Sequence, residues 1–102
     1  MEYIDIDKDS IPYEFDITIK GESFTFEVFY NTLKDYFTLN LLRNGEILVL
    51  GEKVVYAKPL FLTSRHKDIP KVNIIPYDLT NKAEKVTFEN FNQQVFLFMV
   101  GD

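Results

Sequence analysis

The chain has 102 residues, of which 46% are hydrophobic and 16% aromatic, and it contains neither Trp nor Cys. Its length predicts one compact domain spanning residues 1–102, and its apolar content excludes a disordered chain. The absence of cysteine excludes disulfides, thiol catalysis and zinc–thiolate sites. No apolar run approaches the roughly 18 residues that span a membrane, and the acidic N-terminus is unlike a secretory leader.

The net charge of −5 is concentrated in one half of the chain. Residues 1–51 hold ten acidic and four basic side chains, whereas residues 52–102 hold six and seven. Nucleic acids and anionic membranes are both bound mainly through Lys and Arg. We therefore expect neither a nucleic acid nor a membrane as a partner.

The first strong structural signal is a two-residue period. Apolar and polar side chains alternate over residues 13–19 and again over residues 24–30. Such alternation is typical of half-buried strands. Because Gly21-Glu22-Ser23 lies between the two segments, they are predicted to form a β-hairpin.

A second hairpin is predicted directly after the first. Residues 36–42 alternate in the same way, and Asn44-Gly45 tolerates the positive φ of a type I′ turn. Residues 46–50 are the expected partner strand. Residues 54–56 are predicted to continue it, and residues 60–62 to form a strand edge or a further short element.

The second half of the chain is less regular. Residues 63–71 are polar and are expected to form a surface loop, and residues 72–75 a short strand that stops at Pro76. Residues 78–85 are turn-rich, and residues 86–88 are predicted to form a brief strand.

The last element, Val95 to Val100, has six consecutive apolar residues, so both of its faces require burial. It is expected to be a central strand, or a strand with one face covered by a partner. The whole pattern predicts an all-β fold: a small antiparallel β-barrel or sandwich of about seven or eight short strands, with little or no helix.

Two groups of residues suggest metal binding or catalysis, and neither has the required pattern. Asp5, Asp7 and Asp9 alternate as in an EF-hand loop, but Ser10 takes the place of the required glycine and no helices flank the segment. We interpret these carboxylates as a solvated acidic edge.

His66 is the only histidine, and it lies between Ser64 and Asp68. Alternate neighbours in one loop do not form a hydrogen-bonded triad, and one histidine does not build a multi-histidine metal site. The sequence therefore predicts no catalytic residues, no metal ligands and no cofactor.

A series of short motifs follows a recognisable order. They are Ile11-Pro12, the hairpin from Phe15 to Tyr30, Phe37-Thr38-Leu39-Asn40-Leu41, Gly45-Glu46-Ile47-Leu48, Gly51-Glu52-Lys53-Val54-Val55-Tyr56, Pro59-Leu60-Phe61, Ile75-Pro76-Tyr77-Asp78-Leu79-Thr80, Val86-Thr87-Phe88-Glu89-Asn90-Phe91 and Val95-Phe96-Leu97. In this order and spacing the chain resembles a family of small phage baseplate proteins named after the plug of a contractile-tailed cyanophage. Similar proteins are encoded in phages and prophages of Gram-positive bacteria.

The resemblance implies a structural role. The protein would be made in the bacterial host cytoplasm and built into the tail baseplate of the virion, where it would help to close the distal end of the tail tube. Its partners would be other tail or baseplate hub proteins, with a homo-oligomer left open. The alternative hypothesis is a small β-barrel module that binds a ligand or a glycan.

Three segments are candidates for the contact surface. They are the acidic N-terminal strand, the polar loop around residue 66, and the C-terminal strand. The residues named for them are Tyr3, Asp5, Asp7, Arg65, His66, Phe96 and Phe98.

Overall fold

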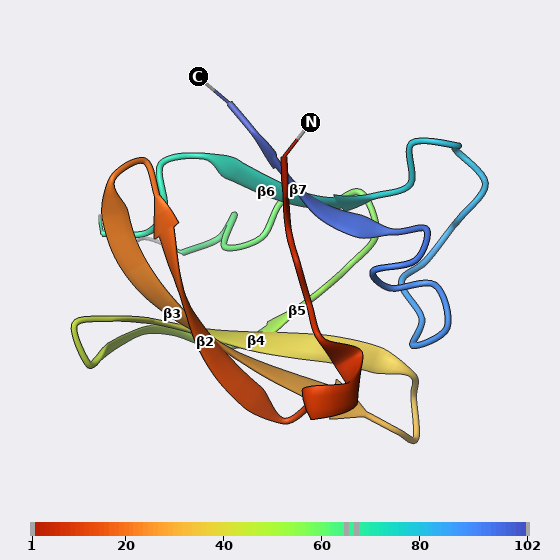
Figure 1. Ribbon diagram of the computed structural model, residues 1–102, viewed down its shortest axis with the longest axis horizontal. Helices are drawn as coiled ribbons and strands as arrows, with labels where there is room; N and C mark the ends of the chain where they lie inside the picture. The colour runs from red at the N-terminus through yellow and green to blue at the C-terminus, as the bar shows by residue number, and fades with distance from the viewer. Residues whose placement is uncertain (1, 65, 67, 102) are drawn as a thin grey trace.

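The computed structural model describes residues 2–64, 66 and 68–101 of the chain. Within these residues, seven strands form two antiparallel sheets, which confirms the predicted all-β fold (Figure 1). The helical content of this part is one short 3-10 turn, η1 (Lys8–Ser10). The strands are β1 (Tyr3–Ile4), β2 (Tyr13–Ile19), β3 (Glu22–Asn31), β4 (Tyr36–Arg43), β5 (Glu46–Lys53), β6 (Asn73–Tyr77) and β7 (Phe96–Val100).

Sheet B has the order β2-β3-β4-β5 and is a simple meander of adjacent strands. Both predicted hairpins are present, and the β4–β5 turn is at Asn44-Gly45 as expected. The first turn lies earlier than predicted, at Lys20 and Gly21, whose φ angles are 54° and 78°. Two residues with positive φ make a type I′ turn, so Glu22 is already the first residue of β3, paired with Ile19.

Sheet A has the order β1-β7-β6, so the last strand of the chain pairs with the first. Tyr3 lies opposite Phe98, and Ile4 opposite Leu97. The prediction that the C-terminal apolar run forms a central strand is confirmed. In Figure 1 the two termini accordingly emerge close together beside sheet A.

Strand β6 runs through Pro76, where the sequence predicted that it would stop. The carbonyl groups of Ile74 and Pro76 accept hydrogen bonds from the amides of Leu60 and Ala57, on the side of β6 that faces away from β7. The nitrogen of Pro76 faces that same side, so its missing N–H removes nothing from the ladder to β7.

Three predicted strands are wrong. The chain at residues 54–56 leaves sheet B after one bond from Val54 N to Phe37 O and turns at Ala57, whose φ is 62°. Residues 60–62 lie in a turn with Phe61 at a φ of 61°, and residues 86–88 are held by loop hydrogen bonds between Thr87 and Asn90. Each segment buries apolar side chains without a strand partner, namely Val54, Leu60, Phe61 and Val86. A pattern of burial alone does not reveal the missing ladder.

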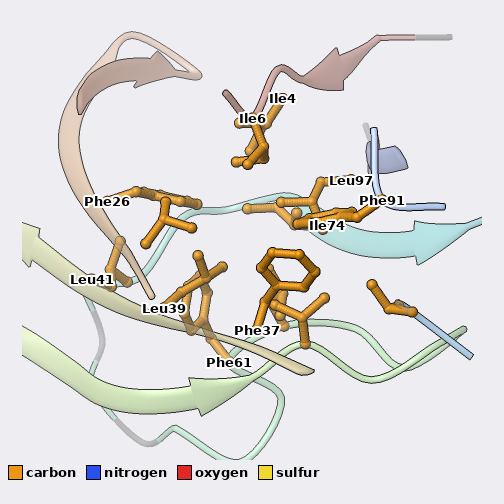
Figure 2. Close-up of a cluster of buried hydrophobic side chains, with 14 of the residues drawn as sticks. Ile4, Ile6, Phe26, Phe37, Leu39, Leu41, Phe61, Ile74, Phe91 and Leu97 are labelled. Carbon is orange, nitrogen blue, oxygen red and sulfur yellow. The ribbon is translucent and has the colours of Figure 1, made fainter. Parts of the chain in front are cut away.

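The two sheets face each other across one hydrophobic core (Figure 2). Sheet B contributes the inward side chains of β3 and β4, including the fully buried Phe26 and Phe37. Sheet A contributes Ile74 and Leu97, while Ile6 enters from the segment that follows β1. Because the sheets do not close on one another, the fold is a sandwich rather than a barrel.

Candidate protein interface

The outer surface of sheet A carries apolar and aromatic side chains in place of the polar ones expected on a solvent-facing sheet. Alternation places Ile4, Ile74 and Leu97 in the core, so their neighbours face outwards. Here the outward-facing set is called the aromatic face. It consists of Tyr3, Ile75, Tyr77, Phe96, Phe98 and Val100, and the polar Asn73 lies on the same side at the start of β6.

The rings of this face contact one another directly. Tyr3 lies 4.7 Å from Phe96 and 6.2 Å from Phe98 between ring centroids, and Phe96 and Phe98 are 6.0 Å apart. Phe98 sits between Tyr3 on β1 and Ile75 on β6, so only 6% of its surface is exposed although it faces outwards. The rings of this cluster thus hold one another in place by their own packing.

A shallow hollow of about 340 Å³ lies on this face. Leu79 and Val100 on its rim are 59% and 38% exposed, and Tyr3 beside it is 44% exposed. The residues lining the hollow are Ala57, Ile75, Tyr77, Leu79, Phe98 and Val100. A contiguous apolar surface of this kind is typical of a contact surface for another protein.

At one side of the aromatic face, a buried carboxylate stabilises the loop that follows β6. Asp78 directly follows β6 and is only 1% exposed. Hydrogen bonds from the Thr80 hydroxyl, from Gln94 and from the amides of Ala83 and Thr80 hold the pKa of Asp78 well below its usual range, against the opposing effect of burial. The ionised carboxylate therefore organises the loop that carries Leu79. The signal in the sequence is Asp-x-Thr after a strand, a pattern typical of a side-chain-stabilised turn.

Two of the predicted N-terminal residues do not join the aromatic face. The strand ends at Ile4, so Asp5 and Asp7 lie beyond it. Asp5 accepts a hydrogen bond of 2.7 Å from the Asn92 side chain, and Asp7 caps η1 by accepting from Asp9 N and the Ser10 hydroxyl. The Asp7 contacts shape the chain between β1 and β2, and the Asp5 contact ties that segment to the turn before β7.

The predicted loop candidate lies in a different region. His66 Nε2 is 3.8 Å from a carboxylate oxygen of Glu46, at the start of β5, and Nδ1 accepts a hydrogen bond of 3.2 Å from Asp68 N. Ser64 accepts from His66 N, so these three residues form a local turn and not a relay. Arg65 lies outside the described residues.

The structure thus brings together three of the predicted interface residues, Tyr3, Phe96 and Phe98. Sequence reasoning proposed the C-terminal strand, which contains Val100, without naming that residue, and it missed Ile75 and Tyr77 of β6. Residues 2–64, 66 and 68–101 contain no group of three or more His, Asp or Glu side chains placed to hold a metal ion. In the same residues, no helix is both long and apolar enough to cross a membrane.

Comparison with known proteins identifies the family of this sandwich. Residues 1–102 match the family model described as "Cyanophage baseplate Pam3 plug gp18". The chain belongs to this family of baseplate plugs. Its place is therefore the tail baseplate of the virion, and a family of structural parts implies a non-enzymatic role among other tail proteins. None of the curated proteins and none of the solved structures in the comparison matches the chain.

Proposed function

We propose that this baseplate plug helps to close the distal end of the tail tube at the hub, and that it is held there by protein–protein contacts through the aromatic face. The observation that carries the proposal is the apolar outer surface of sheet A. Most small sheets have one solvated polar face, whereas here both faces of β7 are apolar. Burial against a neighbouring baseplate protein gives the outer face the apolar environment that its side chains favour.

The charge of the plug fits a position on the path of the genome. A net charge of −5 repels phosphates, so DNA leaving the tube would not adhere to it. The measurement is binding of the purified plug to duplex DNA at low salt. Tight binding under those conditions would contradict this part of the proposal.

The interface is tested in the phage that encodes the protein, with substitutions that place charge on the rim of the hollow in the aromatic face. Leu79→Lys and Val100→Lys change exposed side chains, so the fold should tolerate them. Leu62→Lys is the matched control, because Leu62 is 61% exposed but does not line the hollow on the aromatic face. We expect the two face variants to be absent from purified tails and the control to be retained.

The closing role is tested separately by imaging tails that lack the plug. Density at the distal end of the tube should disappear when the gene is deleted and return when it is restored.

Normal incorporation of both face variants into tails would contradict the proposed interface. A folded monomer that binds glycan arrays through the exposed rings would favour the alternative of a glycan-binding module.

A further inference from the structure

A second surface, independent of the aromatic face, lies at the edge of sheet B. Among the described residues, strand β2 is an edge strand of sheet B and pairs with β3 alone. The type I′ turn makes Ile19 and Glu22 the first hydrogen-bonded pair, so alternate residues back to Tyr13 bond to β3. The N–H and C=O groups of Glu14, Asp16 and Thr18 therefore point away from the sheet. No backbone group in the described part of the chain bonds to them.

The apolar row of β2 is incompletely buried. Tyr13, Phe15 and Ile17 face the core side of sheet B but stay partly exposed, whereas their partners on β3 are 0–1% exposed. The difference arises because β3 has a strand on each side and β2 has one only. A further strand alongside β2 would extend sheet B and cover this row.

The opposite face of β2 is acidic. Glu14 lies directly across from Glu27, and Asp16 is two residues further along the same strand. Like charges directly opposite one another destabilise a sheet. Glu27 and Asp16 accept hydrogen bonds from the neutral Asn40 and Thr25, and no Lys or Arg in the described residues pairs with Glu14 or Asp16. Within the part of the chain that the structure describes, Glu14, Asp16 and Glu27 therefore have no cationic partner.

We propose that the free edge of β2 binds an extended segment of another protein by strand addition. The segment carries apolar side chains at alternate positions, which cover Tyr13, Phe15 and Ile17, and Lys or Arg between them, which pair with Glu14 and Asp16. Main-chain hydrogen bonds give the affinity, and the alternation of charge and apolar surface gives the selectivity. A second copy of this chain is a poor occupant, because antiparallel pairing of two β2 edges would set carboxylates against carboxylates.

The test uses the full-length, isotope-labelled protein and a capped heptapeptide of alternating lysine and valine. The expected result is a shift of the backbone amide signals of Glu14, Asp16 and Thr18, with affinity that falls as salt is raised. A matched peptide of alternating glutamate and valine should bind at least about tenfold more weakly. Equal binding of the two peptides, or shifts confined to other surfaces, would overturn the proposal.

Two variants distinguish the contribution of main-chain hydrogen bonds to peptide binding from the contribution of charge. Asp16→Ala keeps the outward N–H and should weaken lysine-peptide binding only in part, whereas Asp16→Pro removes that N–H and should abolish binding. Proline is tolerated where its nitrogen faces away from the sheet, and the thermal melt of each variant checks its fold.

If Asp16→Pro does not fold, the variant that combines Glu14→Lys with Asp16→Lys is the decisive test. It should prefer the glutamate peptide, and an unchanged preference for lysine would contradict the proposal. Leu79→Lys on the aromatic face should leave peptide binding unchanged, so this test and the test of the baseplate interface can fail independently. A dimer formed by the unmodified protein through β2 would also contradict the proposed occupant.

Discussion

The side-chain amide of Gln94 donates a hydrogen bond of 2.8 Å to the carboxylate of Asp78, sixteen residues earlier in the chain. The bond joins the turn before β7 to the loop after β6, at one end of the aromatic face. Both side chains, together with Leu79 and Phe96, border a second hollow of about 190 Å³. The shape of this part of the surface therefore depends on one buried polar contact.

Asp78→Asn should destabilise the plug markedly. The Asp78 carboxylate accepts five hydrogen bonds, three of them at Oδ2 from Lys82 N, Ala83 N and Gln94 Nε2. An amide nitrogen in place of either oxygen would face donors and leave them unsatisfied. We expect the Tm to fall by more than about 5 °C in a thermal melt followed by circular dichroism.

The control for that substitution is Asp9→Asn. Asp9 is exposed, and its side chain makes no hydrogen bond within the described residues. The Tm of the Asp9→Asn variant should match that of the unmodified protein within about 2 °C. A similar fall in both variants would show that loss of charge, and not loss of the buried network, governs stability.

The stability of the plug should decrease at acid pH. Hydrogen bonds lower the pKa of two carboxyl groups. The largest effect on the pKa of Asp78 comes from the Thr80 hydroxyl, and the largest effect on the pKa of Asp35 comes from the Tyr30 hydroxyl. A carboxyl group whose pKa is lower in the folded state stabilises the protein when the pH is above its unfolded-state pKa of about 3.9. This stabilisation is lost as the pH falls through the folded-state pKa. Urea midpoints measured between neutral pH and about pH 2 should therefore fall mainly below about pH 4. Asp78→Asn should flatten this dependence, and a profile identical to that of the unmodified protein would contradict the assignment.

Phe37→Ala should cost about 3–5 kcal/mol of unfolding free energy. Phe37 is completely buried, with ring centroids 4.6 Å from Phe91 and 4.8 Å from Tyr30. Phe29→Ala is the comparison on the neighbouring strand, because Phe29 points outwards and is 40% exposed. Chemical denaturation should show a loss of less than about 1 kcal/mol for Phe29→Ala. Equal losses would mean that the inward and outward faces of sheet B are assigned incorrectly.

Asn40→Ala should loosen the irregular part of β5. The Asn40 side chain donates to Glu27 over 2.9 Å and accepts from Gly51 N over 2.8 Å, beside the register shift between β4 and β5. Loss of both bonds should reduce stability by about 1 kcal/mol. The same substitution should speed hydrogen exchange at the Gly51 amide. Thr38→Ala, on the same face of β4, should leave that amide as protected as before.

The fold was predictable where its contacts are local. Strands β2 to β5 follow one another through short turns, so alternation and the Asn44-Gly45 signal were sufficient to predict sheet B. Sheet A pairs residues from the two ends of the chain, and no local signal predicts that Tyr3 lies opposite Phe98. The apolar residues near Val54 and Phe61 resembled strands because they are buried, although the chain there turns.

The candidate interface was predictable for a related reason. Six consecutive apolar residues at the C-terminus predicted that both faces of the last strand would be covered, and Phe96 and Phe98 lie on the outer one. Asp5 and Asp7 were wrongly grouped with Tyr3 as one strand, because the pattern does not show that β1 ends at Ile4. The network of Asp78 depends on Gln94, which becomes a neighbour only after the chain has folded.

The pairing of the first strand with the last has a consequence for the order of events during synthesis. Residues 13–53 can form sheet B as soon as they leave the ribosome, since each strand has its partner close by in the chain. Strand β1 emerges before sheet B but has no partner until Phe96 to Val100 have been made. Closing this longest loop should be a late step of folding, and pulse-labelled hydrogen exchange should show Ile4 protected after the amides of β3. The outer rings of Tyr3 and Phe98 therefore come together only after β7 has been made, so the aromatic face forms later than sheet B.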